Sequence, residues 1–301
     1  MVLSVSDLKK KYDQDDVVKG ISFHVEKGEV FGFLGKNGAG KSTTVNILTG
    51  ISRPSSGEIS ILGTPYHQIN HIKKRIGVLP DNSNYFNDLT LLQHLVYFSK
   101  IKGISADKKY LYAMLERVGL ADSAHKKVGQ FSLGMKKKLG IAQALLGDPE
   151  LLFLDEPTAA LDMESTLAIR GLIRSQADQG TTIFMTSHNL DEVEKLCTRI
   201  AILEEGQLTK IGSIHELQES FSKDIRLSIQ IQGDSESIQR VREILLEREW
   251  IHSFHYKDRE IELQIPSMES IPQIVQVAVE NQLLIYGVST EKVSLEQIFL
   301  A

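Results

Sequence analysis

The sequence predicts an α/β protein: a mixed sheet with helices on both sides, extended by an antiparallel β subdomain, a helical subdomain and a small C-terminal α+β unit. Two observations support this fold class. Short apolar runs alternate with segments of helical periodicity over residues 1–221, which indicates a largely parallel sheet. From residue 222 the order becomes β-α-β-β-α-β, which is typical of a ferredoxin-like domain. We therefore expect two domains, residues 1–221 and 222–301.

The most informative segment is the glycine-rich stretch at residues 35–43, which fits the phosphate-loop pattern G-x-x-x-x-G-K-[ST]. It lies between a predicted buried strand, residues 29–34, and a predicted helix that starts at Ser42. Glycines let backbone N–H groups wrap a phosphate, and the helix start adds free donors. Lys41 would reach the terminal phosphates, and the Ser42 hydroxyl would bind Mg²⁺. A simple glycine-rich turn is the alternative, which the flanking strand and helix disfavour.

The loop residues that we expect to bind the nucleotide are Gly35, Asn37, Gly38, Ala39, Gly40, Lys41, Ser42 and Thr43. Ahead of the loop, Tyr12 is a candidate platform for stacking on a purine base, because an aromatic face suits any base. A single tyrosine at this place is more often an ordinary residue of a sheet edge. Only its position before the phosphate loop favours the binding role.

Composition and charge limit the classes of protein that fit. Of the 301 residues, 42% are hydrophobic and 24% are charged, and the net charge is −5. This balance argues against a nucleic-acid binder. Cys197 is the single cysteine, which suits a reducing cytosol and excludes a disulfide framework. The sequence shows no signal peptide and no apolar run of about 18 residues, so we expect another chain to supply any membrane-spanning part.

The antiparallel β subdomain is expected from three strand patterns, at residues 2–8, 17–25 and 58–62. The helical subdomain, at about residues 82–147, is expected from three stretches of helical periodicity, residues 89–101, 107–118 and 133–146. The remaining elements of the first domain are strands at residues 75–79, 200–203 and 207–211 and a helix at residues 162–178.

Two further apolar runs end in polar residues. Residues 151–154 read as a fully buried parallel strand that ends in Asp155 and Glu156, and residues 182–186 as another that is followed by His188. Because ligands bind at the carboxyl ends of strands in open parallel sheets, these side chains are candidates for the same site as the phosphate loop.

The second domain contains no clustered ligands and no glycine-rich loop. Its expected elements are strands at residues 225–231, 251–257, 260–265 and 284–289 and helices at residues 235–249 and 270–282. We interpret it as a regulatory or dimerisation domain.

These motifs together resemble those of a known family. The phosphate loop is followed by Phe-Ser-Leu-Gly-Met at residues 131–135, Leu-Leu-Phe-Leu-Asp-Glu-Pro at residues 151–157, Ala-Ala-Leu-Asp at residues 159–162 and His188. In this order and spacing they resemble the ATP-binding subunit of an ABC transporter over roughly residues 2–220. The second glycine of the signature is present as Gly134 and the first is replaced by Leu133, a form similar to that of the drug- and antibiotic-exporter branch.

The resemblance implies a role for each motif residue. Asp155 would hold Mg²⁺, Glu156 would polarise the attacking water as general base, and His188 would contact the γ-phosphate. Asp81 stands at or beside a position where the wider family carries a glutamine, and it is a further candidate Mg²⁺ ligand. The resemblance also implies head-to-tail pairing with a second nucleotide-binding subunit, either another copy or a paralogue. Ser132 and Gly134 would then complete the partner's ATP site, and Asp162 would lie at the contact.

We therefore expect an ATPase subunit, with ATP and Mg²⁺ as its cofactors, that drives export through a separate transmembrane permease and is held by it on the cytoplasmic face of the membrane. One alternative is a soluble, non-transport ABC ATPase that acts on a ribosome or nucleic-acid complex. Such relatives usually carry two nucleotide domains or a long coiled-coil insertion. The other alternative is a module that holds ATP without turnover, against which Glu156 and His188 argue.

Overall fold

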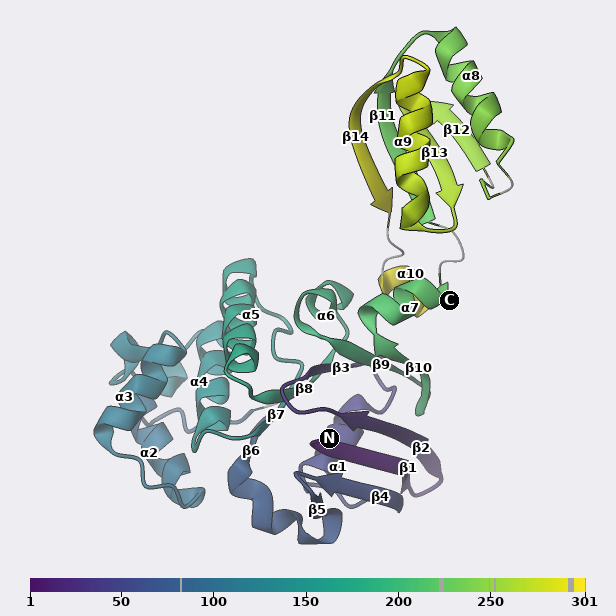
Figure 1. The fold of residues 1–301 in the computed structure, drawn as a ribbon. Helices are drawn as coiled ribbons and strands as arrows, with labels where there is room; N and C mark the ends of the chain where they lie inside the picture. Colours follow the sequence, from purple (N-terminus) through teal and green to yellow (C-terminus); the bar gives the residue numbers. More distant parts are fainter. Residues whose placement is uncertain (82, 222–224, 249, 252, 292–294, 301) are drawn as a thin grey trace. The chain divides into compact units, whose positions relative to one another are not determined.

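Two units, Met1–Ile214 and His215–Ala301, make up the chain in the computed structural model (Figure 1). The structure describes residues 1–81, 83–221, 225–248, 250–251, 253–291 and 295–300. The boundary between the units falls at the start of helix α7 (Ile214–Phe221), whereas the sequence places it at the end of that helix.

A six-stranded sheet forms the centre of the larger unit. Its strands are β3 (Val30–Leu34), β6 (Ile76–Leu79), β7 (Leu151–Asp155), β8 (Thr182–Ser187), β9 (Arg199–Glu204) and β10 (Gln207–Ser213). Their order is β10-β9-β3-β8-β7-β6, and all neighbours pair in parallel except the antiparallel edge strand β10. The prediction of a mixed sheet is confirmed. The strands β3, β7 and β8, which carry the motif residues, are adjacent at its centre.

A four-stranded antiparallel sheet packs against this one, which confirms the predicted antiparallel β subdomain, although its short strand β5 was not predicted. Its strands are β1 (Leu3–Tyr12), β2 (Asp15–Val25), β4 (Ser56–Ile61) and β5 (Thr64–Pro65), in the order β2-β1-β4-β5. Strand β1 runs beyond its predicted end at Leu8. The apolar alternation breaks there because the pairing shifts between Val5 and Leu8, next to Asp7 with a φ of 44°.

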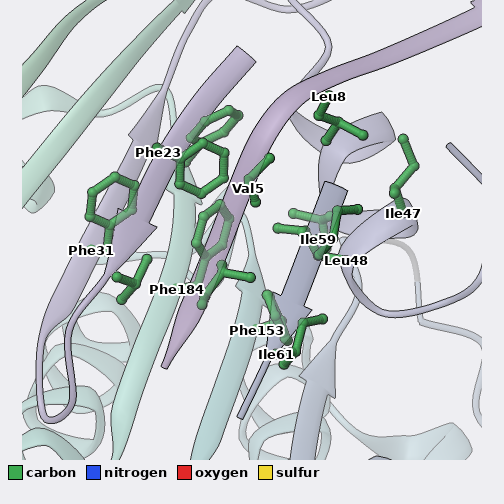
Figure 2. Packing of buried hydrophobic residues seen from close by; sticks show 14 of the residues in the cluster. Val5, Leu8, Phe23, Phe31, Ile47, Leu48, Ile59, Ile61, Phe153 and Phe184 are labelled. Atoms are coloured by element: carbon green, nitrogen blue, oxygen red, sulfur yellow. The ribbon is translucent and has the colours of Figure 1, made fainter. Parts of the chain in front are cut away.

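The core of the larger unit lies between the two sheets. Figure 2 shows Phe31, Phe153 and Phe184 of the six-stranded sheet facing Val5, Ile59 and Ile61 of the antiparallel one. Helix α1 (Lys41–Leu48) contributes Ile47 and Leu48 to the same cluster. Full burial stabilises the fold by roughly 1.5–3 kcal/mol for each large apolar side chain, which fixes the strand and helix on either side of the phosphate loop.

Other helices cover the opposite face of the six-stranded sheet. A Cβ on Gly32 of β3 would lie 2.8 Å from Sγ of Cys197 and 3.2 Å from Cγ1 of Val193, which belongs to α6 (Leu190–Leu196). A Cβ on Gly77 of β6 would lie 2.2 Å from the Ala144 carbonyl oxygen of α4 (Leu133–Leu145). Gly77 therefore lets the backbone of α4 approach the sheet, and Gly32 leaves room for the side chains of Val193 and Cys197.

The predicted helices of the helical subdomain are confirmed as α2 (Leu91–Ile101), α3 (Lys108–Arg117) and α4, and the long helix after Asp162 as α5 (Met163–Asp178). Each begins at a side chain that accepts a backbone N–H: Thr90, Asp107, Ser132 and Asp162. Helix α6 was not predicted, because its seven residues are too few for a clear periodicity. The short 3-10 helices are η1 (Tyr66–Arg75), η2 (Ala121–Ser123), η3 (Val128–Gln130) and η4 (Met268–Ser270).

The second unit contains its own four-stranded antiparallel sheet, in the order β12-β13-β11-β14. The strands are β11 (Ile225–Gln232), β12 (Ser253–Lys257), β13 (Glu260–Ile265) and β14 (Leu284–Glu291), and the helices between them are α8 (Ser235–Leu246) and α9 (Ile271–Glu280). Apolar residues of α8 and α9 pack on the sheet in one cluster with Leu227, Ile229 and Ile231. A short helix, α10 (Leu295–Leu300), follows β14.

Candidate functional site

The phosphate loop connects β3 to α1, as the sequence predicts. Gly38 and Gly40 have φ values of 84° and 108°, which other residues adopt only with strain. A Cβ on Gly40 would also lie 2.9 Å from the Val17 carbonyl oxygen. Gly40 precedes α1 without a capping side chain, and the first turn of α1 carries no acidic residue. The backbone donors and positive dipole end of α1 are therefore available to an anion.

Lys41 is only 6% exposed, although it carries a charge. Its Nζ donates to the carbonyl oxygen of Gly35 at 2.6 Å and to that of Lys36 at 3.3 Å. The ammonium group is thus held inside the curve of the loop. Lys36 and Gly38, which form the rim of the loop, are exposed. This arrangement suits a ligand that brings negative charge onto the loop from solvent.

Asp155 ends β7 and is 4% exposed. Thr186 of β8 donates its hydroxyl to Oδ1 of Asp155 at 2.5 Å. Burial raises the pKa of the Asp155 carboxyl, while hydrogen bonds from Thr186 and Ser42 act in the opposite direction. A buried carboxylate beside the Ser42 hydroxyl has the oxygen chemistry that Mg²⁺ prefers.

Glu156 lies at the centre of the predicted catalytic group. Its carboxylate is 12% exposed, with Oε1 3.6 Å from Nζ of Lys41 and Oε2 2.8 Å from Nδ1 of His188. His188 is 55% exposed, so one side of the cluster opens to solvent. The structure therefore brings together three side chains that the sequence assigns to catalysis, and they come from the carboxyl ends of the adjacent strands β3, β7 and β8.

The backbone of Glu156 is also unusual. Its φ of 48° lies in the left-handed region, which is costly for a long side chain. The strained peptide is held on two sides, because Glu156 N–H donates to the Thr186 hydroxyl at 3.0 Å and its carbonyl oxygen accepts from Nζ of Lys137 at 2.9 Å. The conformation aims the carboxylate at Lys41 and His188.

Asp81, the third candidate metal ligand, is exposed and lies near Lys137. Nζ of Lys137 lies 3.8 Å from Asp81 Oδ1 and 3.4 Å from its carbonyl oxygen. In the part of the chain that is described, no group of three or more His, Cys, Asp or Glu side chains is arranged to hold a metal ion. This donor set still fits Mg²⁺, which is commonly bound by one or two protein oxygens together with water and substrate phosphate.

Tyr12 lies at the end of β1, opposite Asp15 of β2. Its hydroxyl is 3.4 Å from the Ser52 hydroxyl, and Nζ of Lys10 lies 4.5 Å from the centre of its ring. The ring is 44% exposed, so a stacking surface is present. These contacts join Tyr12 to the strand and to the segment after α1, and stacking on a base stays a prediction.

The signature residues 132–135 form the start of α4, away from this cluster in the sequence but still in the same unit. The Ser132 hydroxyl accepts from Met135 N–H at 3.3 Å, and Ser132 is exposed. Gly134 is buried against α5. A Cβ at this position would lie 2.3 Å from Oγ of Ser165. Oγ of Ser165 in turn donates to Asp162 at 3.1 Å. The sequence predicts that Asp162 and Gly134 both face a partner chain. Within this chain, the Ser165 side chain contacts both of them.

Thr186, Lys137 and Ser165 were missed by sequence reasoning. A weak signal exists for Lys137, which stands three residues after Gly134 and four before Ile141, on the buried face of α4. A lysine at a core position of an amphipathic helix indicates a specific partner. Thr186 stands in a run of apolar strand residues, where a single threonine is too common to be informative.

A cavity of about 470 Å³ adjoins the cluster and is lined by Glu156, His188 and residues 158–161, with Met163 and Leu167 among the apolar residues at its wall. Met163 and Leu167 are both exposed. The Glu156–His188 pair therefore faces a hollow whose wall is mixed, because Arg170, Asp191 and Lys195 also line it. No helix in the described part of the chain is both long and apolar enough to cross a membrane.

Comparison with known proteins gives consistent results. Residues 18–159 match the family described as ABC transporter. The chain is 34% identical to the bacitracin transport ATP-binding protein BcrA of Bacillus licheniformis, over 99% of this chain and 96% of the relative. It is 32% identical to the linearmycin resistance ATP-binding protein LnrL of Bacillus subtilis, over 99% and 97%. A Nod factor export ATP-binding protein I of Burkholderia pseudomallei is 39% identical over 72% and 73%.

Solved structures agree with these relatives. An ATP-binding subunit of an ABC transporter superposes with a TM-score of 0.66 at 29% identity, covering 73% of this chain and 93% of the solved one. The cbiO1 protein of Clostridium perfringens superposes with a TM-score of 0.64 at 31% identity, covering 72% and 90%.

Proposed function

The chain belongs to the ABC transporter family of ATP-binding proteins, and we propose that it hydrolyses ATP to drive export through a separate transmembrane permease. The observation that carries the catalytic part is the contact of the Glu156 carboxylate with the buried Lys41 on one side and the half-exposed His188 on the other, beyond the carboxyl ends of β3, β7 and β8. Export is supported by two relatives, named for bacitracin transport and linearmycin resistance, that align with 99% of this chain.

In the proposed reaction the loop residues 35–43 and the start of α1 hold the phosphates through backbone N–H groups. Lys41 neutralises charge on the terminal phosphates. The Glu156 carboxylate accepts a hydrogen bond from the attacking water and polarises it as general base. His188 fixes this carboxylate from the solvent side. Ser42 and Asp155, with Asp81 as a further candidate, would hold Mg²⁺, which supplies charge neutralisation on the phosphate oxygens.

The proposed site is shared between two nucleotide-binding subunits. Ser132 and Gly134 lie on the start of α4 and Asp162 lies on the start of α5. Ser132 and Asp162 are exposed, so their polar groups are accessible to a partner. Head-to-tail pairing would place Ser132 and Gly134 against the phosphates held by the partner's loop. A homodimer and a pair with a paralogue both satisfy this geometry, and no nucleic acid is part of the proposal.

The proposed location is the cytoplasmic face of the membrane, where a permease subunit holds the chain. Residues 222–301 are proposed to be a ferredoxin-like domain that regulates or stabilises the pair. Its support is the β-α-β-β-α-β order with both helices on one face of an antiparallel sheet.

The experiment that tests the proposal is purification of the tagged chain from membranes, followed by reconstitution of the complex in vesicles. We expect a membrane-spanning subunit to copurify, ATP hydrolysis to occur, and ATP-dependent export of the permease's substrate to disappear with Glu156→Gln. Copurification with ribosomes or nucleic acid, without a permease, would support the soluble alternative instead. ATP binding without turnover in the complete complex would contradict the catalytic assignment.

A further inference from the structure

Lys137 is a charged side chain in a place that charged side chains rarely occupy. It lies on α4 and is 7% exposed, with its Nζ 2.9 Å from the carbonyl oxygen of Glu156 and 3.4 Å from that of Asp81. The Asp81 carboxylate is 3.8 Å away. Glu156 follows β7 and Asp81 follows β6, so one ammonium group connects helix α4 to the segments after two neighbouring strands.

The contact with Glu156 acts on a strained peptide. The left-handed conformation of Glu156 requires its carbonyl and N–H groups to be held, and Lys137 and Thr186 hold one each. Because backbone orientation sets the direction of the side chain, a displacement of Lys137 would shift the carboxylate relative to Lys41 and His188. Lys137 therefore affects catalytic geometry without touching the nucleotide itself.

The same helix begins at the signature. Ser132 caps α4, and Lys137 follows five residues later, about 7–8 Å along the axis at roughly 1.5 Å per residue. A hydrogen-bonded helix transmits a displacement over this distance as a rigid body. We propose that Lys137 is a positioning residue that couples a nucleotide engaged by Ser132 and Gly134 to Glu156 and Asp81 of this chain's own site.

This coupling rests on the proposed function, since it requires a partner's nucleotide at the start of α4. The coupling connects the two halves of the shared site. When a partner's nucleotide closes onto Ser132, α4 moves, and Lys137 moves with α4. Lys137 then adjusts Glu156 and the segment that contains Asp81. The consequence is that engagement of α4 by a partner's nucleotide adjusts the position of the Glu156 carboxylate in the chain that carries this α4.

The first test is the steady-state ATPase activity of the purified complex with Lys137→Met, which keeps the length and loses all donors. We expect kcat to fall about tenfold or more, because a small misplacement of a catalytic group lowers the rate strongly. KM for ATP should stay within about twofold. Lys137→Gln, which retains a donor for the Glu156 carbonyl, should give an intermediate kcat and serves as the test if the methionine variant does not fold. Lys136→Met, one residue earlier on the helix, is the matched control and should behave as wild type.

The second test is a double-mutant cycle with Ser132→Ala. If Ser132 and Lys137 act through one helix, the loss of kcat in Ser132→Ala/Lys137→Met will be smaller than the product of the single losses. Losses that multiply, a wild-type kcat for Lys137→Met, or a change confined to KM would each overturn the coupling. A wild-type complex that does not hydrolyse ATP would contradict the proposed function instead, so the two failures are distinguishable.

Discussion

The phosphate loop and the start of α4 both carry glycine-containing motifs, but they differ in how their polar groups are satisfied. Around the loop, the charged side chains of Lys41, Asp155 and Glu156 are largely buried, and each has a partner in this chain. Lys41 donates to the Gly35 carbonyl oxygen and pairs with Glu156, and Asp155 accepts from the Thr186 hydroxyl. At the start of α4, Ser132 is exposed and its hydroxyl accepts only from its own helix among the described residues. The proposed catalytic cluster is thus assembled within one chain, whereas Ser132 of the signature is exposed, which favours a shared site.

The largest expected effect comes from the cluster of charged side chains around the phosphate loop. Glu156→Gln keeps size and shape but removes the charge that polarises water, so we expect kcat to fall by a factor on the order of 10²–10⁴. ATP affinity should be retained, because Lys41 and the loop are unchanged. Single-turnover hydrolysis and equilibrium ATP binding measure the two quantities. A variant that turns over at the wild-type rate would remove Glu156 from the proposed role.

Lys41→Ala should affect binding itself. Hydrogen bonds to charged groups contribute about 1.5–3 kcal/mol, which corresponds to a loss of ATP affinity of roughly ten- to a hundredfold. Lys36→Ala is the matched control, because Lys36 is exposed and contributes only its carbonyl oxygen to the bond with Lys41. Titration with a fluorescent ATP analogue compares them, and equal affinities for both variants would contradict the placement of Lys41.

The start of α4 can be tested through its packing, because Gly134 is buried although Ser132 is exposed. Gly134→Ala would place a Cβ 2.3 Å from Oγ of Ser165, so we expect a loss of stability of about 1–3 kcal/mol from overpacking. Gly171→Ala on α5 has no atom within 4 Å of the new Cβ and should be neutral or stabilising by up to about 1 kcal/mol. Urea unfolding of both variants measures the difference. The close approach of α4 to α5 would be contradicted if Gly134→Ala were as stable as wild type.

The smallest expected effect contrasts two carboxylates. The pKa of Asp155 is raised by burial, so its contribution to stability is greatest at acid pH and is lost as pH rises through the folded-state pKa. Asp155→Asn should therefore raise Tm at neutral pH without nucleotide. The pKa of Asp162 is lowered by the Ser165 N–H, so its contribution is present at neutral pH and lost on acidification.

Asp162→Asn should accordingly lower Tm slightly at neutral pH, whereas Asp155→Asn should raise it. Thermal unfolding at neutral and acid pH in the absence of Mg²⁺ and ATP measures both shifts, and the shift for the exposed Asp162 is expected to be the smaller one. Shifts of the same sign in the two variants would contradict the contrast between a buried and an exposed carboxylate.

Sequence patterns predicted the parts of this structure that depend on local order. The strands that end at Asp155 and precede His188 are fully buried and contain continuous apolar runs, and the four capped helices follow clear periodicity. The parts that were missed depend on approach between segments far apart in the chain. Thr186 is an ordinary strand residue until β7 lies beside it, and Ser165 matters only because α4 reaches α5 at Gly134. The extension of β1 past Leu8 was missed because a bulge interrupts the alternation.

The measurement that tests the shared site most directly is complementation between two inactive chains. One chain carries Lys41→Ala and cannot hold the phosphates. The other carries Ser132→Arg and cannot complete its partner's site. A mixed pair contains one site with wild-type Lys41 and wild-type Ser132. We predict that mixing regains ATP hydrolysis that neither variant shows alone, whereas a mixture as inactive as its components would contradict a site built from two chains.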